Sequence, residues 1–163
     1  MKVILLQPPV WGIYEPPIAL AQISACLEKN DIDVSVYDLN IKLYNQRTKK
    51  YQNDWTIERS PFWFDEKWVE TYFNDNIIQI NEHISCILDY NPEVICFSVN
   101  ANSWHATRML AERILQRKNV KIVLGGPVFL VPFHVNQYFK HNVVDIVIYG
   151  EGEKTMVNLM NIL

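Results

Sequence analysis

The chain has 163 residues, of which 49% are hydrophobic and 20% are charged, and its formal net charge is −3. These values are typical of a single soluble globular domain, and they argue against a nucleic-acid surface, since no basic run is longer than the two residues of Lys49-Lys50. The apolar runs are too short to span a membrane, and the one at the start meets Gln7-Pro8-Pro9 before it is long enough for a signal peptide.

Short apolar runs alternate along the chain with segments of helical periodicity. In chain order they predict a strand at 3–6, a helix at 17–30, a strand at 33–38, a helix at 75–90, a strand at 94–99, a helix at 103–118 capped by Ser103, a strand at 121–124, a helix at 134–140, a strand at 145–149 and a helix at 155–163. Strands that are apolar on both faces indicate a parallel sheet covered on both sides. We expect an α/β, doubly wound, flavodoxin-like fold whose five-stranded sheet has the order 2-1-3-4-5 and helices on both faces.

One segment breaks this rhythm. Residues 39–93 separate the second and third strands, about twice the length that one helix and its turns need. The extra part, at about 41–74, is rich in tyrosine, tryptophan and phenylalanine, unlike a disordered linker. We expect a helical or irregular insert packed on the sheet edge, within one domain over residues 1–163. Burial of its rings is favoured over a role as a recognition surface.

The carboxyl ends of the strands are the expected ligand site, because open parallel sheets bind ligands there. The loops at this edge are 7–17, 38–40, 98–103, 125–131 and 150–154. All the glycines of the chain lie in these loops: Gly12, Gly125, Gly126, Gly150 and Gly152. Turns after strands use glycine for their own geometry, but glycine also lets a backbone approach a ligand closely. Their gathering at one edge favours a ligand site.

Several common sites do not match these loops. The run from Gln7 to Gly12 is not a dinucleotide-binding GxGxxG, and its two prolines lack the N–H donors that a phosphate loop uses. Gln7 and Ser98 stand where a phospho-acceptor domain needs acids, and no Walker A lysine loop is present. The histidines and cysteines have neither metal-ligand nor catalytic spacing, and the thiols are expected to be reduced, as in the cytoplasm. The residues indicate a binding domain without catalytic or metal-ligating residues.

At these loops the sequence resembles the N-terminal domain of cobalamin-dependent radical SAM proteins. The resemblance covers the chain apart from the insert, and it rests on Gln7-Pro8-Pro9 with 16–21, on 92–98, on 123–127 and on 145–155. The most specific part is Gly-Gly-Pro followed after about 18 residues by Asp-Ile-Val-Ile-Tyr-Gly-Glu-Gly-Glu. The resemblance implies a cobalamin against the carboxyl ends of the strands, with its nucleotide tail between sheet and helices.

The resemblance also implies roles for residues. In related mutase and methionine synthase domains, a D-x-H-x-x-G motif supplies a histidine to cobalt. The aspartate, histidine and glycine positions of this motif hold Gln7, Pro9 and Gly12 in this chain. The resemblance therefore implies a bound cobalamin whose cobalt has no protein histidine ligand. Ser98 would bind the tail, Gly125 and Gly126 would make room for it, and Trp11 or Tyr14 would cover the lower corrin face. The remaining candidate cofactor-binding residues are Pro8, Asn100, Pro127, Gly150, Glu151 and Gly152.

The catalytic half of such proteins is a barrel whose CxxxCxxC motif binds a 4Fe-4S cluster and whose substrate is S-adenosylmethionine. This sequence has no such motif and ends where the linker to the barrel is expected. We expect the barrel as a covalently following partner, methyl transfer as the reaction of the longer protein, and no nucleic-acid or membrane partner. Two alternatives stay open. One is the same fold without cobalamin, as a substrate- or partner-binding domain, and the other is an independent flavodoxin-like nucleotide-binding protein.

Overall fold

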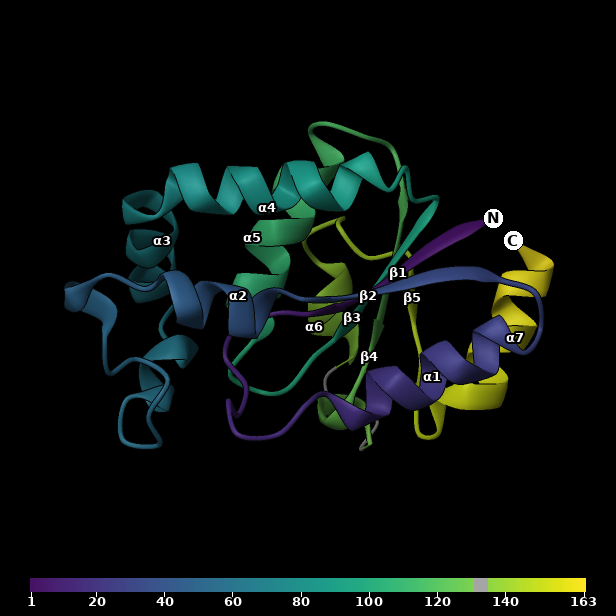
Figure 1. The fold of residues 1–163 in the computed structure, drawn as a ribbon, viewed down its shortest axis with the longest axis horizontal. Helices are drawn as coiled ribbons and strands as arrows, with labels where there is room; N and C mark the ends of the chain where they lie inside the picture. Colours follow the sequence, from purple (N-terminus) through teal and green to yellow (C-terminus); the bar gives the residue numbers. More distant parts are fainter. Residues whose placement is uncertain (131–134) are drawn as a thin grey trace.

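A parallel sheet of five strands forms the centre of the computed structural model, which describes residues 1–130 and 135–163 (Figure 1). The strands are β1 (Lys2–Gln7), β2 (Asp33–Asp38), β3 (Val94–Ser98), β4 (Lys121–Gly125) and β5 (Ile146–Val147). Their order is β2-β1-β3-β4-β5, which confirms the predicted flavodoxin-like α/β topology. The register places Gln7 opposite Asp38 and Ser98 opposite Gly125, so the strand ends meet at one edge.

Helices cover both faces of this sheet. On one face, α1 (Ile18–Glu28) and α7 (Gly152–Ile162) pack on each other and on Val3 and Leu5 of β1. On the other, α4 (Ile77–Asp89) and α5 (Trp104–Leu115) pack over Ile4 and Leu6. Successive side chains of a strand point to opposite faces, so each apolar strand contributes to two cores. Within the described residues, no helix has the length and apolar character needed to cross a bilayer.

Some elements differ from their predicted form. β5 contains only Ile146–Val147 instead of 145–149, because its pairing with β4, its single neighbour, covers only Val123–Ile146 and Leu124–Val147. α7 begins at Gly152 rather than Thr155, since Gly150, with a φ of 65°, turns the chain two residues before the helix. Ser103 precedes α5 as predicted, but its hydroxyl bonds the backbone of Asn100 instead of a helix N–H. α6 spans Val135–Phe139, and its predicted first residue, 134, lies outside the described residues, as does residue 131.

The aromatic insert contributes mainly to the core. It contains α2 (Leu39–Gln46), two 3₁₀ turns (Lys49–Tyr51 and Ser60–Phe64) and α3 (Glu66–Asp75), and it extends from the carboxyl end of β2 at the left of Figure 1. Trp55, Trp63 and Tyr72 are at most 7% exposed, and the ring centroids of the two tryptophans are 5.4 Å apart. These rings share one core with Ile80 of α4, as the burial expectation requires. Phe62 and Phe64 remain exposed.

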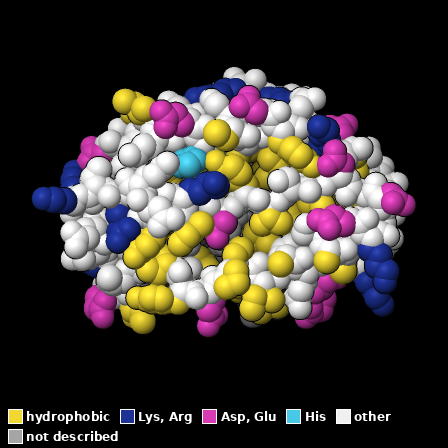
Figure 2. All heavy atoms as spheres, in the orientation of Figure 1, with side chains coloured by type: hydrophobic (Ala, Val, Ile, Leu, Met, Phe, Trp, Pro, Cys, Tyr) yellow, Lys and Arg dark blue, Asp and Glu magenta, His cyan; other side chains and the backbone are white. Residues whose placement is uncertain are grey.

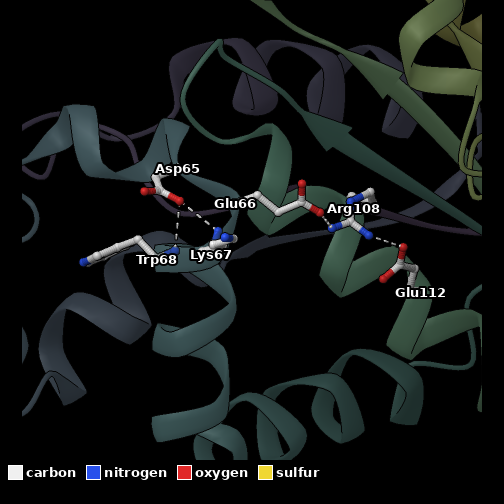
Figure 3. Close-up of polar contacts among 6 residues, drawn as sticks. All are labelled: Asp65, Glu66, Lys67, Trp68, Arg108 and Glu112. Atoms are coloured by element: carbon white, nitrogen blue, oxygen red, sulfur yellow. Dashed lines mark hydrogen bonds and ion pairs between the residues drawn. The ribbon is translucent and has the colours of Figure 1, made fainter.

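Polar contacts fix α3 against α5 (Figure 3). Asp65 caps α3: one carboxylate oxygen accepts from the N–H groups of Lys67 and Trp68 at 2.9 and 3.3 Å. Arg108 of α5 forms ion pairs with Glu66 in the first turn of α3 and with Glu112 on its own helix. The mostly buried guanidinium therefore ties the insert to the helix that follows β3.

The insert follows β2, which forms the open edge of the sheet. β2 is the terminal strand, so one row of its backbone groups faces outward. Figure 2 shows apolar side chains gathered in a hollow over this strand, between α4 and α1, and Val36 of β2 is 39% exposed.

Candidate functional site

A pocket of about 230 Å³ opens at the carboxyl edge, between the sheet and helices α1 and α7. Leu5, Cys96 and Val123 supply its wall from β1, β3 and β4, and Ile23 of α1 and Met156 of α7 lie opposite. Burial raises the pKa of the Cys96 thiol well above its ordinary range, so this side chain is neutral and acts as an apolar wall group. The interior therefore suits an apolar ligand group.

Two adjacent glycines form one side of the mouth, and they differ in what surrounds them. Gly126 has a φ of 114°, and a Cβ there would lie 2.6 Å from the backbone N and O of Val99, so its glycine is required by the fold. Gly125 lines the pocket, and a Cβ there would meet no atom within 4 Å. The packing of the protein therefore does not require a glycine at position 125. The free space beside this strand end is space that a ligand can occupy.

The turn from β5 into α7 forms the other side of the mouth. A Cβ on Gly152 would lie 3.1 Å from Ile23 Cδ1, so this glycine allows α7 to pack closely on α1. Glu153, in the first turn of α7, also lines the pocket and is placed favourably for the helix dipole. The predicted residues that come together in the lining are Ser98, Gly125, Gly126, Pro127, Gly150, Glu151 and Gly152.

The other predicted residues are not part of the pocket lining: Gln7, Pro8, Pro9, Trp11, Gly12 and Asn100. Gln7 is 2% exposed, and its amide nitrogen is 3.5 Å from the carbonyl oxygens of both Pro8 and Ser98. Asn100 Nδ2 donates to the Val10 carbonyl at 2.9 Å. These two side chains are therefore directed at the backbone of the β1–α1 loop, residues 8–17.

Asn40 lies in the predicted ligand loop 38–40, but sequence reasoning assigned it no role. It lies in the first turn of α2, directly after β2, and is 1% exposed. Its Oδ1 accepts from the Trp11 N–H at 3.0 Å and from the Trp55 indole at 2.8 Å. Its Nδ2 donates to the carbonyls of Trp11 and Gly12 at 3.3 and 3.4 Å. The sequence does show a polar residue shortly after a strand, at the edge where ligands bind. It does not show the hydrogen-bond partners of Asn40, because they are distant in sequence.

Titratable groups lie mostly away from this pocket. Burial lowers the pKa of His83, which lies between the Tyr37 hydroxyl and Gln46 Oε1, 2.8 Å from each. Burial also lowers the pKa of His105 at the start of α5. Over residues 1–130 and 135–163, no group of three or more His, Cys, Asp or Glu side chains is arranged to hold a metal ion.

Two solved structures share this fold. Both are of the radical S-adenosylmethionine methyltransferase TsrM from Kitasatospora setae, one with tryptophan substrate and a SAM analogue (aza-SAM) bound, the other with cobalamin and a [4Fe-4S] cluster bound. Each is 19% identical to this chain over 98% of its length, with TM-scores of 0.60 and 0.59. The chain spans about a quarter of their length, 25% and 26% respectively. No curated protein matches the sequence.

A family model described as the B12 binding domain matches residues 65–160. This stretch is more than half of the chain, and it runs from the start of α3 into α7. It therefore includes both sides of the pocket mouth, with Ser98, Gly125 and Gly150. The chain belongs to the B12-binding domain family.

Proposed function

We propose that this chain binds cobalamin, with the nucleotide tail of the cofactor in the pocket between the sheet and helices α1 and α7. The free space beside Gly125, within the part that matches the B12-binding family, is the observation that carries the proposal. The apolar wall formed by Leu5 and Val123 suits the aromatic base of the tail, and Ser98 offers a hydroxyl at the mouth. Gly125 and Gly126 leave room for the sugar-phosphate part.

We also propose that cobalt receives no histidine from the β1–α1 loop. Residues 7–17 contain no histidine, and Gln7 and Pro9 take the places of the acid and the histidine of the related motif. The Gln7 amide lies against the backbone of Pro8 and Ser98, which leaves it poorly placed to serve as a substitute ligand. Trp11 is half-buried and Tyr14 is 93% exposed, so Tyr14 is the more accessible ring for the lower corrin face.

For the longer protein, we propose that this domain serves a following radical SAM barrel in methyl transfer. The support is the shared fold with TsrM, whose chain is about four times as long as the matched part. Cobalamin supplies the methyl-carrying metal in such chemistry, and the 4Fe-4S cluster and S-adenosylmethionine belong to the barrel. The residues of this chain bind and orient the cofactor, and they exclude water from its tail.

The test is retention of hydroxocobalamin. The purified chain is mixed with a molar excess of ligand, desalted and examined for the cobalamin absorption spectrum. We expect retention by the wild-type chain and a loss of affinity of more than about tenfold for Ser98→Trp, because an indole occupies the space that the tail needs. Ser98→Ala is the matched control that keeps the space open. If the wild-type chain retains no cobalamin, the proposal is wrong.

A second candidate is a substrate- or partner-binding domain that does not bind cobalamin. It is favoured by the exposed side chains of Ile57, Phe62 and Phe64 on the insert, which are 87%, 40% and 55% exposed. Failure of the wild-type chain to retain cobalamin would favour this candidate.

A further inference from the structure

We infer that Asn40, held by the indole of Trp55, positions the β1–α1 loop of the proposed cobalamin site, so that the aromatic insert forms part of that site. The inference rests on the proposed function for the identity of the ligand. Its structural half, the coupling of the insert to the loop, stands on contacts of the protein alone.

The side-chain amide of Asn40 uses its full hydrogen-bonding capacity. The two lone-pair positions of Oδ1 face the Trp11 N–H and the Trp55 indole N–H, at 3.0 and 2.8 Å. The two N–H groups of Nδ2 face the carbonyl oxygens of Trp11 and Gly12. If the amide oxygen and nitrogen exchanged places, the nitrogen would face the N–H donors of Trp11 and Trp55, and the oxygen would face the carbonyl oxygens of Trp11 and Gly12. These contacts therefore define a single orientation of the amide. Burial of the amide makes every one of these partners costly to lose.

Three side chains hold the start of the β1–α1 loop at successive points. Gln7, the last residue of β1, contacts the Pro8 carbonyl, and Asn100, in the loop after β3, contacts the Val10 carbonyl. Asn40 then holds Trp11 and Gly12. The chain from Tyr14 to Pro16 is exposed, so Asn40 is the last of these anchors before the loop extends toward α1. The loop is connected to the pocket at both ends, because Gln7 before it contacts the carbonyl of Ser98, and α1 after it contributes Leu20 to the pocket lining.

Trp55 connects this anchor to the insert. The ring is 7% exposed and packs edge-on against Tyr44, Trp63 and Tyr72, with centroids 5.4 to 6.0 Å apart. Its indole nitrogen, the one polar atom of the side chain, donates to Asn40. The aromatic cluster therefore fixes the indole, the indole fixes the amide, and the amide fixes the loop backbone.

A pair of conservative variants tests this coupling. Trp55→Phe keeps a ring in the cluster but removes the donor to Asn40. Trp63→Phe is the matched control, because Trp63 is equally aromatic, is fully buried in the same cluster, and donates to the Asp54 carbonyl at 2.9 Å without contacting Asn40. Asn40→Asp is the second test variant: it keeps the side-chain shape and sets a carboxylate oxygen against the Trp11 and Gly12 carbonyls. Thermal unfolding establishes that each variant is folded.

The first measurement is hydrogen exchange of the Trp11 amide by NMR without ligand, and the second is the dissociation constant of hydroxocobalamin. We expect Trp55→Phe to speed the exchange and weaken binding, each by about fivefold, the effect of one lost hydrogen bond, and Asn40→Asp to have a larger effect. Trp63→Phe should affect both less than Trp55→Phe does, because it leaves the indole donor to Asn40 in place.

The outcomes separate this inference from the proposed function. If the wild-type chain binds hydroxocobalamin and both tryptophan variants behave alike, the inference is overturned and the proposed function stands. If the wild-type chain does not bind, the proposed function falls, and the role of Asn40 in a cofactor site falls with it. The exchange data then decide only the coupling of the insert to the loop, which is overturned if Trp55→Phe leaves the Trp11 amide as protected as in the wild-type chain.

Discussion

Gly125 and Gly126 are neighbours for which we expect opposite effects of substitution. A Cβ at position 125 would meet no atom within 4 Å, and valine suits a strand, so Gly125→Val should change the free energy of unfolding by less than about 1 kcal/mol. The valine occupies pocket volume, so hydroxocobalamin affinity should fall by more than about tenfold. Urea unfolding and ligand titration measure the two quantities. A stable variant that binds as well as the wild-type chain would exclude the tail from this position.

Gly126→Ala is the matched control, for which we expect a lower free energy of unfolding. Its Cβ would lie 2.6 Å from two backbone atoms of Val99, at a φ that side chains rarely adopt. We expect a loss of about 2 kcal/mol or more in the free energy of unfolding, because the backbone itself must shift.

His83 gives the stability of the chain a predictable pH dependence. Burial and then the charge of Lys42 lower its pKa from an ordinary value of 6.5, and burial does the same for His105. Between the lowered pKa and 6.5 the unfolded chain binds more protons than the folded one, so the free energy of unfolding falls as pH falls through this window. Below the lowered pKa this contribution is lost in full.

The measurement is urea unfolding at several pH values between about 7.5 and 5.5, where carboxylates contribute least. His83→Gln cannot titrate, and its amide can still contact Tyr37, so its stability should depend less on pH than that of the wild-type chain. An unchanged slope would mean that His105 or another group carries the dependence.

At the scale of elements, the cap of α3 is separable from the ligand site. Asp65→Ala removes the acceptor for two N–H groups in the first turn and should cost about 1 kcal/mol of the free energy of unfolding. Asp65→Asn keeps a capping oxygen and should cost less. Cobalamin affinity should not change in either variant, because α3 does not line the pocket. A loss of affinity in both variants would mean that the insert acts on the site through α3 as well as through Trp55.

Periodicity was sufficient to predict the sheet order and the buried helices, since apolar strands alternating with amphipathic segments admit few arrangements. Periodicity did not predict the features that depend on contacts in three dimensions. The length of β5 depends on pairing with β4 alone, and the first turn of α7 depends on the turn at Gly150. The pocket glycines were predictable because they lie at or shortly after the carboxyl ends of two strands. The anchoring role of Asn40 was not, because its partners Trp11 and Trp55 are 29 and 15 residues away.

At the scale of the molecule, the sheet separates two cores of unequal size. The larger core lies under α4 and α5 and includes the insert, whereas the smaller one lies under α1 and α7. The pocket is in the smaller core, where open volume replaces packed side chains between Leu20 of α1 and Met156 of α7. A ligand in this volume supplies contacts that the chain alone lacks, so α1 and α7 are the elements that binding should stabilise most.

This asymmetry predicts where cobalamin protects the chain. At a ligand concentration about a hundred times the dissociation constant, the free energy of unfolding should rise by about 2.7 kcal/mol. Amide exchange through local opening should slow in α1 and α7, which bound the pocket, and should change little in α3 and α4 on the other face. Hydrogen exchange with mass spectrometry, with and without hydroxocobalamin, resolves these helices. Protection centred on α3 and α4 would place the ligand against the insert instead, because a bound group reduces opening first in the elements that it touches.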